Sequence, residues 1–416
     1  MSVSQPRGAC PGLWAPMPTG DGLLVRFRPG QPMPPAAFAA LCAAAREHGN
    51  GLIEISARGS VQVRGLTAAS APRFASTLAT LDLAATGNVP VITDPLRDDP
   101  EALIDATAIA AEVRRAIEVA GLSLAPKVSV LLDGGGGLHL DALAGDVRLR
   151  AIAPVEAPRL HVALAGDARS AAPLGAIPPR AAATTVVRLL GVIAAHGATA
   201  RAADILRRQG PAPFRAVVEG SIEPAYAPPA RPVCEAMGTH PLREGFHALG
   251  VAPAFGQADA DALAQLAGLA GELGARSLNA APGRVLLISG LTRPQALALA
   301  LRAERLGFIV RPDDPRRRIT ACPGRPACAS GFIAARALAG EIAQRLPQLR
   351  SEIHVSGCDK GCAHPAPAAL TVVGSERGCG IVRCGSARAI PRGYVEPADL
   401  VAEVVRAMPP EEARRG

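Results

Sequence analysis

Two pairs of closely spaced cysteines are the residues whose type and spacing most directly suggest chemistry. Cys322 and Cys328 form a C-x5-C pair in TACPGRPAC, and Cys358 and Cys362 form a C-x3-C pair in SGCDKGCAHP. Zinc sites favour shorter spacings in both pairs, whereas a [4Fe–4S] cube takes four thiolates and accommodates the longer loop. The spacing predicts such a cluster, with structural zinc and buried free thiols as the alternatives.

The other five cysteines are weaker candidates. Cys10, Cys42 and Cys234 are isolated, and Cys42 falls in a helical apolar pattern that is typical of a core residue. Cys379 and Cys384 form a C-x4-C pair that could host a second metal. Two sulfurs without a nearby histidine make a poor metal site, so we expect them to be structural.

The segment between the two cysteine pairs predicts a helix over Ala329–Leu346. A helix that begins directly after Cys328 would point its positive end at an anionic cluster. Gly324, Gly357 and Gly361 lie within or beside the pairs, where the missing side chain lets backbone amides approach sulfur.

An internal repeat organises the rest of the chain. Glu47–Thr67 aligns without a gap with Glu272–Thr292, at an offset of 225 positions, and both copies end in Gly-Leu-Thr. Each copy follows a helical pattern and reads as strand, helix, strand, strand, with a left-handed glycine expected after each helix. Because one such unit is too small to bury its sheet, we expect two copies to pair about a pseudo-two-fold axis. The expected helices are Ala36–His48 and Asp259–Leu273, and the expected strands are Leu52–Ile55, Val61–Val63 and Val285–Ile288.

The region between the two copies predicts a helix that opens at Asp98-Asp99-Pro100 and stops near Gly121, followed by a strand over Lys127–Leu132. The glycine run Gly134–Gly137 fits no phosphate-binding motif and indicates a flexible turn. Gln209–Pro232 is rich in proline and reads as an extended linker.

Composition narrows the class of protein. The chain has 416 residues, is 49% hydrophobic and carries a net charge of +8, with only two lysines, Lys127 and Lys360, among its 44 basic residues. It lacks a basic run with interleaved aromatics, a membrane-length apolar stretch and a signal-peptide apolar region. We therefore expect a cytoplasmic protein with no nucleic acid and no membrane partner, whose cysteines serve metal binding or catalysis.

The cysteine pairs, lying downstream of a duplicated ferredoxin-like half-domain, resemble the sirohaem sulfite/nitrite reductase superfamily. Within it, RGACPGLWAPMPTGDGLLVRFRP and HVSGCDKGCAHPAPAALTVVG are most similar to the precorrin-3B synthase family, over roughly residues 8–395. The resemblance implies that Cys322, Cys328, Cys358 and Cys362 bind the cluster, with Cys362 nearest the tetrapyrrole.

The resemblance also implies an α+β fold: duplicated ferredoxin-like half-domains plus two α/β sulfite-reductase-type domains, one of them carrying the iron–sulfur cluster. The expected boundaries are 15–78 and 239–305 for the half-domains, 79–208 for the central domain, 209–238 for the Pro-rich linker and 306–400 for the iron–sulfur domain.

In the reductases, an arginine of an R-x-x-x-Q strand binds the substrate anion. It matches Arg58 with Gln62, and Arg64 continues on the same face of the expected strand. A Lys-x-Lys strand of the reductases here reads Lys127-Val128-Ser129, and their second arginine is replaced by Gly87. Arg58 and Lys127 are thus the catalytic candidates, and both join Gln62 and Arg64 as substrate-binding candidates; a solvated strand edge is the alternative.

With two of four cations missing, many-electron reduction of a small anion is disfavoured. The resemblance instead implies a monooxygenase of cobalamin biosynthesis that oxygenates precorrin-3A at C20 and closes a γ-lactone to give precorrin-3B. Its co-substrate is O2 and its ultimate reductant is NADH. Because the chain shows no nucleotide-binding fingerprint, we expect a separate electron-donor reductase. The alternative is a sirohaem-dependent assimilatory sulfite or nitrite reductase, and a non-catalytic electron carrier or sensor is a third possibility.

The family is also associated with an additional non-haem iron. His354, His364 and Asp359 lie near the cysteines, but their spacing matches no iron triad, so they are left unassigned. Arg316-Arg317-Arg318 and Lys360 are further candidates for contact with substrate carboxylates.

Overall fold

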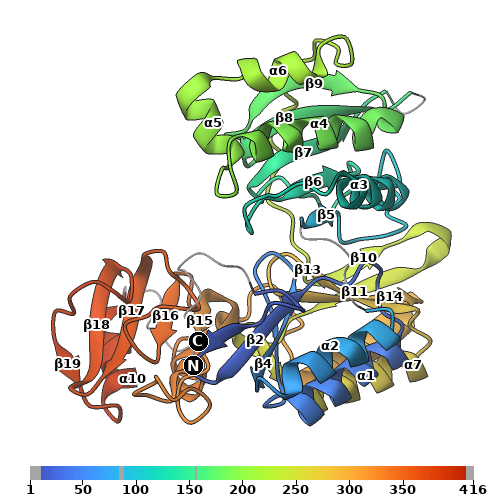
Figure 1. Cartoon of the computed structure of the whole chain (residues 1–416). Helices are drawn as coiled ribbons and strands as arrows, with labels where there is room; N and C mark the ends of the chain where they lie inside the picture. Colours follow the sequence, from blue (N-terminus) through green and yellow to red (C-terminus); the bar gives the residue numbers. More distant parts are fainter. Residues whose placement is uncertain (1–10, 84–88, 155–156, 409–416) are drawn as a thin grey trace.

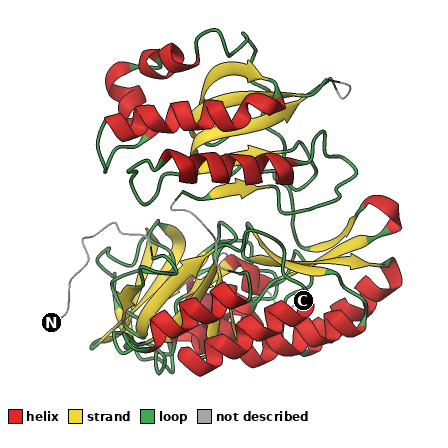
Figure 2. Ribbon diagram, turned by 45° about the vertical axis from the view of Figure 1, so that its right-hand side comes forward, coloured by secondary structure: helices red, strands yellow, loops and turns green. Residues whose placement is uncertain are grey.

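The computed structural model describes residues 11–83, 89–154 and 157–408. In it, a central domain lies above two further bodies, one built from the two repeat copies and one from the C-terminal part of the chain (Figure 1). Each body combines β-sheets with helices, so the α+β class is confirmed, and Figure 2 shows helices packed along the sheets of each.

The two repeat copies form one body with a similar order of elements in each half; the second half has one more strand, β12, which pairs into the first sheet. The first sheet has the order β1-β2-β4-β3-β12 and the second has the order β10-β11-β14-β13. The first half consists of β1 Met17–Thr19, β2 Gly22–Phe27, α1 Pro35–His48, β3 Leu52–Ile55, β4 Val61–Leu66 and α2 Ser70–Thr80. The second half consists of β10 Gly238–Pro241, β11 His247–Val251, β12 Gln257–Asp259, α7 Ala260–Glu272, β13 Ser277–Ala281, β14 Val285–Leu291 and α8 Arg293–Arg305.

Equivalent positions of the two halves exchange the same contact. Met33, just before α1, pairs with Leu278 of β13, and Ala258, just before α7, pairs with Ile53 of β3. Both members of the second pair lie 225 positions from their counterparts, which is the offset of the sequence repeat. The expected duplication is therefore present, and the halves meet about a pseudo-two-fold axis with α1 packed against α7.

The two sheets differ on the face turned away from the helices. One face of both sheets packs on α1, α2, α7 and α8 through a shared aliphatic core. On the opposite face of the first sheet stand polar side chains, including Arg26, Glu54 and Gln62. The corresponding face of the second sheet is apolar, where Val285 and Leu287 pack with residues outside the sheet. Only the first half therefore offers a polar sheet face.

The central domain is a five-stranded sheet of order β5-β6-β7-β8-β9, in which β5, β6 and β7 are parallel and the last two strands are antiparallel. Its elements are β5 Val91–Thr93, α3 Ala106–Ala120, β6 Val130–Asp133, β7 Gly145–Ile152, β8 Arg159–Gly166, β9 Ala172–Ile177, α4 Ala182–Ala195, α5 Ala202–Gln209 and α6 Ala212–Val218.

The C-terminal domain repeats this pattern of strand directions. Its sheet has the order β15-β16-β17-β18-β19, again with three parallel strands followed by two antiparallel ones. Its elements are β15 Ile319–Ala321, α9 Ala335–Arg345, β16 Ile353–Ser356, β17 Ala368–Ser375, β18 Gly378–Gly385, β19 Tyr394–Val395 and α10 Leu400–Ala407. Short 3₁₀ turns occupy Pro179–Ala181, Arg243–Gly245, Ala254–Gly256 and Pro315–Arg318.

Two expected helix starts are wrong. The central helix α3 begins at Ala106, where the Asp105 side chain accepts a hydrogen bond from the Thr107 amide, and not at Asp98. Helix α9 begins at Ala335, because residues 329–334 form turns around Cys328. The helix therefore does not begin directly after Cys328. The expectation that its positively charged N-terminus points at an anionic cluster is not supported.

Three smaller expectations also change. Gly49 after α1 has φ −118°, so only its repeat partner Gly274, at φ +85°, is left-handed. Helix α6 lies inside the segment expected to be an extended linker. In the glycine run, the amides of Gly134 and Gly137 donate to carboxylates at 2.7 Å each, which is consistent with a turn and leaves these donors unavailable to phosphate.

None of the helices in the described residues is long and apolar enough to span a bilayer.

Candidate functional site

The two cysteine pairs start from neighbouring parallel strands of the C-terminal sheet. Strands β15 and β16 run side by side in register, with Ala321 opposite Val355. Because both strands end at the same edge of the sheet, Cys322 and Cys358 leave them on the same side. The Cys322 amide donates to the Val355 carbonyl oxygen at 3.2 Å, which extends the pairing to the first cysteine itself. Parallel pairing thus brings together two motifs that the sequence separates.

Backbone groups surround the sulfurs. The amide of Gly357 donates to the Cys322 sulfur at 3.0 Å, and the Cys328 amide donates to the Gly324 carbonyl oxygen at 2.7 Å. Gly324 has φ +62°, a conformation that favours glycine, so this residue shapes the C-x5-C loop. The expectation that glycines let amides approach sulfur is met at Gly357.

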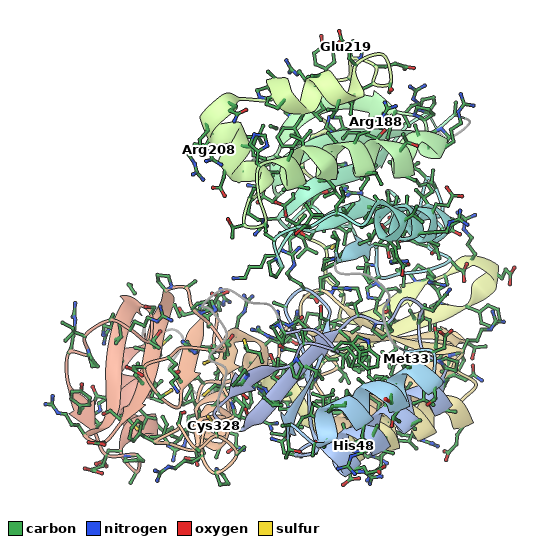
Figure 3. The ribbon with its side chains drawn as sticks, in the orientation of Figure 1. Met33, His48, Arg188, Arg208, Glu219 and Cys328 are labelled. Atoms are coloured by element: carbon green, nitrogen blue, oxygen red, sulfur yellow. The ribbon has the colours of Figure 1, made fainter. Side chains whose placement is uncertain are left out.

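The first half-domain touches the same loop. The Gly20 carbonyl oxygen, in the turn between β1 and β2, accepts a hydrogen bond from the Ala329 amide at 2.9 Å. A Cβ atom at Gly20 would lie 2.4 Å from the Cys328 sulfur. Figure 3 labels Cys328 at this junction between the two lower bodies. The cysteine loop is therefore closed on one side by a glycine of another domain, which the sequence did not indicate.

The four sulfurs influence one another. Burial, and then the neighbouring Cys358 and Cys328, raise the pKa of Cys322. Burial and then Cys358 also raise the pKa of Cys362, whereas Arg64 lowers it. Among the described residues, no three His, Cys, Asp or Glu side chains lie close enough together to hold a single metal ion. The four cysteines are thus close enough to perturb one another's pKa values, and four thiolates are the donor set that a [4Fe–4S] cluster takes.

Gln62 and Arg64 lie on the same face of β4, as the sequence predicted, and both have partners. The Arg64 guanidinium contacts Asp21 at 3.1 Å and Glu54 at 3.2 Å. Burial alone would lower the pKa of Arg64, but these two carboxylates raise it. The Gln62 side-chain oxygen accepts from the Nε and Nη2 atoms of Arg26 at 3.0 and 2.7 Å. The first-sheet face thus carries a fixed polar network, and its Arg64 lies near enough to Cys362 to lower the pKa of that thiol.

Arg58 does not lie on that strand, and this expectation is corrected. It lies in the turn between β3 and β4, where the Gly59 amide donates to the Ser56 carbonyl oxygen and Arg58 pairs with Pro282 of the other half. Its guanidinium reaches the central domain and donates to the Ala144 carbonyl oxygen at 2.8 Å and to the Ser129 hydroxyl at 3.3 Å. Arg58 therefore sits where both halves and the central domain meet.

Lys127 precedes its strand and does not form part of it, because β6 begins at Val130. It is exposed in a turn, and no hydrogen bond or ion pair involves its ammonium group in the described part of the chain. Ser129, which stands where the reductases have their second lysine, is buried and meets Arg58. The structure therefore brings Arg58 next to the Lys-x-Lys segment. Gly87 lies outside the described residues.

The sequence reasoning missed three further arginines at this junction. Burial, then Arg58 and then Arg114, lower the pKa of Arg28 to about 10. Burial and then Arg97 lower the pKa of Arg114 in turn. Arg28 and Arg114 are therefore buried cations whose pKa values neighbouring arginines lower further, whereas Asp105 and Asp98 oppose the lowering at Arg97; such a cluster favours anionic groups. Arg28 directly follows β2, and no sequence motif links it to Arg97 or Arg114.

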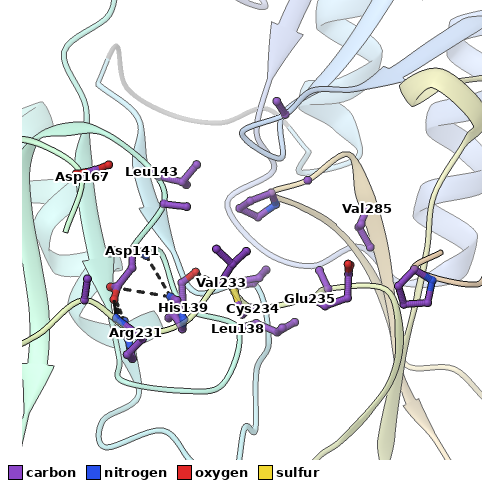
Figure 4. A pocket seen from close by; sticks show the side chains of 18 of the residues that line it. Leu138, His139, Asp141, Leu143, Asp167, Arg231, Val233, Cys234, Glu235 and Val285 are labelled. Carbon is purple, nitrogen blue, oxygen red and sulfur yellow. Dashed lines mark hydrogen bonds and ion pairs between the residues drawn. The ribbon is translucent and has the colours of Figure 1, made fainter. Parts of the chain in front are cut away.

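The triple arginine is mostly neutralised. Arg316 contacts Asp314 at 2.6 Å and Arg317 contacts Glu235 at 2.6 Å, while Arg318 is exposed. Arg317 and Arg318 border a cavity of about 840 Å³ between the central domain and the second half. Figure 4 shows Arg231 in this cavity, bound to Asp141. Apart from Arg317 and Arg318, none of the predicted catalytic, substrate-binding or cluster residues lines it.

The unassigned polar residues near the cysteines form no iron site. His354 is fully buried under His364, their ring centroids lie 5.6 Å apart, and both of its ring nitrogens lack a partner in the described residues. Burial, followed by His364 and Arg284, lowers the pKa of His354 to about 4. Asp359 is exposed and lines a different surface. Lys360 donates to the Ser330 hydroxyl at 2.9 Å.

Cys379 and Cys384 do not form a second metal site. Cys379 and Cys384 both lie on β18, but Cys379 is buried in the core and Cys384 is exposed, so they do not share a metal. Cys42 is fully buried in α1, where burial above all raises its pKa to about 12, which confirms a core role. Cys234 is half-buried beside the cavity described above, and Cys10 lies outside the described residues.

Comparisons with known proteins agree with this architecture. A family model described as the nitrite/sulfite reductase ferredoxin-like half domain matches residues 15–81. The solved structure of the Mycobacterium tuberculosis NirA protein superposes with a TM-score of 0.71 over 95% of this chain and 82% of that one, at 20% identity, which shows a shared fold.

Two curated relatives extend the comparison to sequence. The sulfite reductase [ferredoxin] of Mycobacterium tuberculosis is 31% identical over 211 residues, which are 46% of this chain and 37% of that protein. The precorrin-3B synthase of a Sinorhizobium species is 36% identical over 412 residues, which are 97% of this chain and 88% of that protein. Since identity at this level extends over nearly the whole chain, the protein belongs to the precorrin-3B synthase family, within the superfamily of nitrite and sulfite reductases.

Proposed function

We propose that this protein is the monooxygenase of aerobic cobalamin biosynthesis that converts precorrin-3A into precorrin-3B. It would oxygenate C20 and close a γ-lactone from the ring-A acetate. Family membership supports the pathway and an oxidoreductase activity. The observation that carries the rest is the convergence of both cysteine pairs at one edge of the C-terminal sheet, opposite the polar face of the first half-domain.

In this proposal, Cys322, Cys328, Cys358 and Cys362 hold a [4Fe–4S] cluster. The fit rests on two features of the chain: the cysteine sulfurs alter one another's pKa values, and the Gly357 amide donates a hydrogen bond to the Cys322 sulfur. When bound, such a cluster supplies electrons one at a time. The amide of Gly357 would stabilise negative charge on sulfur, which raises the potential of a cluster held there.

The chain's own arginines would bind and orient the substrate. Precorrin-3A carries several acetate and propionate groups, and Arg28, Arg58 and Arg114 form a patch of mutually repelling cations at the junction of domains. Guanidinium groups suit paired contacts with carboxylates. Lys127, which has no partner in the described residues, would add a further contact beside Ser129. Binding a polyanion would relieve the repulsion among these cations.

Arg64 and Gln62 have a positioning role in this proposal. The Arg64 guanidinium is held by Asp21 and Glu54 and lowers the pKa of Cys362, so it would keep a positive charge near that sulfur without needing to move. Gln62 holds Arg26 on the same face. The carboxylates keep this network nearly neutral, so the excess positive charge for substrate lies with Arg28, Arg58 and Arg114.

The oxygenation balances with O2 and NADH as ultimate reductant: one oxygen atom enters the product, and the other leaves as water with two electrons and two protons. We propose that a separate reductase oxidises NADH, and that the enzyme works in the cytoplasm. Because no grouping of three suitable side chains for a mononuclear iron exists in the described residues, no step is assigned to the additional non-haem iron.

Anaerobic purification with iron and sulfide determination, followed by incubation with precorrin-3A, O2 and a reductant, tests this function. The expected product gains one oxygen atom by mass. Cys362→Ser should abolish turnover, whereas Cys384→Ser, at an exposed cysteine outside the pairs, should not. Sirohaem absorption bands together with sulfite reduction would instead establish the alternative, an assimilatory sulfite or nitrite reductase.

A further inference from the structure

The central and C-terminal domains are related to each other in the same way as the two half-domains. Strands β5 to β8 have the same lengths, one by one, as strands β15 to β18, and their order and directions agree. Asp94 directly follows β5, as Cys322 directly follows β15. The Gly134 amide donates to the Asp94 carboxylate at 2.7 Å, as the Gly357 amide donates to the Cys322 sulfur at 3.0 Å. The duplication therefore includes these two domains.

A second backbone contact is repeated in the same loops. The Leu103 amide donates to the Gly134 carbonyl oxygen at 2.9 Å, and the Phe332 amide donates to the Gly357 carbonyl oxygen at 2.8 Å. The loops after the first two strands thus have a similar backbone arrangement in both domains. Asp94 replaces a cysteine, however, and the sequence contains no cysteine between residues 79 and 208. The central domain therefore has the loops of the candidate cluster site without its thiols.

The pseudo-two-fold axis consequently gives the proposed substrate site a counterpart. Arg58 lies in the turn between β3 and β4 and reaches the central domain, and Gly283 lies in the equivalent turn between β13 and β14. Gly283 lines the cavity of about 840 Å³ together with His139. His139 stands as far beyond the end of β6 as Cys362 stands beyond the end of β16. This cavity therefore has the same place beside the second half and the central domain as the substrate site has beside the first half and the cysteine loops.

The cavity has the size and the apolar surface of a small-molecule site. Its volume falls within the range of about 300–1,000 Å³ that is typical of such sites. Leu138, Val233 and Val285 contribute apolar side chains to the lining. In Figure 4, Val285 lies on the opposite side of the view from the ion pair of Arg231 with Asp141. An apolar body can thus be enclosed between a charged wall and an aliphatic one.

All three carboxylates of the lining are engaged by groups of the protein. Asp141 contacts Arg231 at 2.8 Å, and Glu235 contacts Arg317 at 2.6 Å. Asp167 accepts hydrogen bonds from a hydroxyl at 2.6 Å and from two backbone amides at 2.9 and 3.1 Å. These acidic groups therefore do not compete for the two arginines of the lining that remain.

These two arginines are Arg169 and Arg318. Both are exposed, and neither guanidinium has a hydrogen-bond or ion-pair partner among the described residues. Arg169 comes from the turn after β8 in the central domain, and Arg318 comes from the 3₁₀ turn before β15. Guanidinium groups suit paired contacts with carboxylates. Free guanidiniums from two domains around an apolar surface fit an organic anion with an apolar body and carboxylates at its edge.

We propose that this cavity is a second binding site for a polycarboxylate tetrapyrrole. Arg169 and Arg318 bind its carboxylates, and the apolar side chains of the lining contact its macrocycle. The choice of ligand rests on the proposed function, because it assumes that the fold binds a tetrapyrrole at the equivalent place. Since the central domain has no thiols for a cluster, the ligand is bound there and not converted, and no bond forms or breaks.

The test titrates the purified holoprotein with uroporphyrin III, a polycarboxylate tetrapyrrole, by anaerobic isothermal titration calorimetry. Wild type should bind two molecules per chain. Arg318→Glu should weaken one of the two binding events at least ~10-fold, because a charged contact is replaced by a repulsive one. Val233→Trp should remove the same event without a change of charge, because Val233 lines the cavity and is 86% exposed, so the larger side chain occupies cavity space.

Matched controls lie in the central domain outside the cavity lining. Arg208→Glu makes the same charge change on α5, where Figure 3 labels this residue, and Val119→Trp enlarges a side chain that is 84% exposed. Both should leave the two affinities within ~2-fold of wild type, because exposed charges beyond a Debye length are screened. Arg58→Met should weaken only the other event, which belongs to the proposed substrate site.

The outcomes separate the second site from the proposed function. One molecule per chain, weakened by Arg58→Met and unaffected by both cavity variants, would refute the second site and leave the proposed function intact. Loss of an event in the cavity variants with no effect of Arg58→Met would support the second site and count against the proposed substrate site. Absence of any binding to a wild type that still forms precorrin-3B would overturn the second site alone. Displacement of uroporphyrin from the cavity by equimolar citrate would show that the cavity recognises carboxylates without the macrocycle and would also overturn the proposal.

Discussion

The contact between Gly20 and Cys328 provides the sharpest test of how the cluster site is built. Replacing Gly20 by alanine places a Cβ atom 2.4 Å from the Cys328 sulfur and 2.9 Å from the Ser330 hydroxyl oxygen. Ordinary contacts between such atoms are about 3.5–4.0 Å, so the turn or the cysteine loop must retreat by about 1 Å. Gly20 does not have a positive φ, so the change adds a steric clash without backbone strain.

The loop around Cys328 is held by backbone hydrogen bonds, which limit how far it can move away from the clash. The Gly20 carbonyl oxygen accepts a hydrogen bond from the amide of Ala329, the residue after Cys328. The Cys328 amide in turn donates to the Gly324 carbonyl oxygen. Overpacking of this kind costs about 1–3 kcal/mol, and displacement of one sulfur by about 1 Å exceeds the tolerance of a metal–thiolate site. Gly20→Ala should therefore lower cluster content by at least about half when the protein is purified anaerobically.

The assay is iron and sulfide per chain with the visible spectrum, together with urea unfolding to show that the chain still folds. Gly30→Ala is the matched control, because a Cβ atom there meets nothing within 4 Å and Gly30 also lacks a positive φ. A Gly20→Ala protein with a full complement of iron would refute the reasoning, since the sulfur would then have room that the structure does not provide.

Three further outcomes follow from the site and its supports. Arg64→Met leaves two buried carboxylates unpaired and should cost about 3 kcal/mol in urea unfolding at pH 7; a loss below about 1 kcal/mol would contradict the network described. Burial raises the pKa of Asp141, but hydrogen bonds from Arg231 outweigh it and lower that pKa to about 2, so the stability that Asp141 provides is present above about pH 4 and lost as pH falls toward 2. Wild type should therefore lose roughly 2 kcal/mol more than Asp141→Asn across that range, and parallel unfolding curves would argue against it. Lys127→Met should raise the KM for precorrin-3A roughly 10-fold with little change in kcat, as expected for loss of one charged contact; an unchanged KM would exclude that contact.

The local sequence pattern predicted helices and strands accurately where apolar periodicity alone decides the structure. The helices of the repeat and strand β3 fall within one or two residues of expectation, because apolar periodicity alone specifies which face is buried. Helix starts were less accurate. Asp98-Asp99-Pro100 has the composition of a helix start, yet the Asp99 carboxylate binds the amides of Glu101 and Gly137, so it serves a loop. A capping residue can be recognised in sequence, but its partner cannot.

The substrate-binding candidates also divide into residues that the local sequence placed correctly and residues whose place depends on domain packing. Gln62 and Arg64 share a face, as alternation along a strand requires. Arg58 lies in a turn and reaches Ser129, 71 positions away, through a contact that depends on how the central domain sits on the first half. Arg28, Arg97 and Arg114 escaped notice because nothing in their local sequence indicates that they meet.

By itself, the sequence determined the duplication, the fold class and the four cysteines as a set, because each leaves a periodic or spaced signature along the chain. Only the tertiary structure decided that parallel pairing of β15 with β16 delivers both cysteine pairs to one edge, and that a glycine of the first half closes the loop around Cys328. It also decided that one of two equivalent sheet faces is polar and places Arg64 near Cys362, while the other is covered by apolar residues. Spacing along a chain fixes which side chains are available, but the distance between segments hundreds of residues apart is fixed only when the sheets pair and the domains pack.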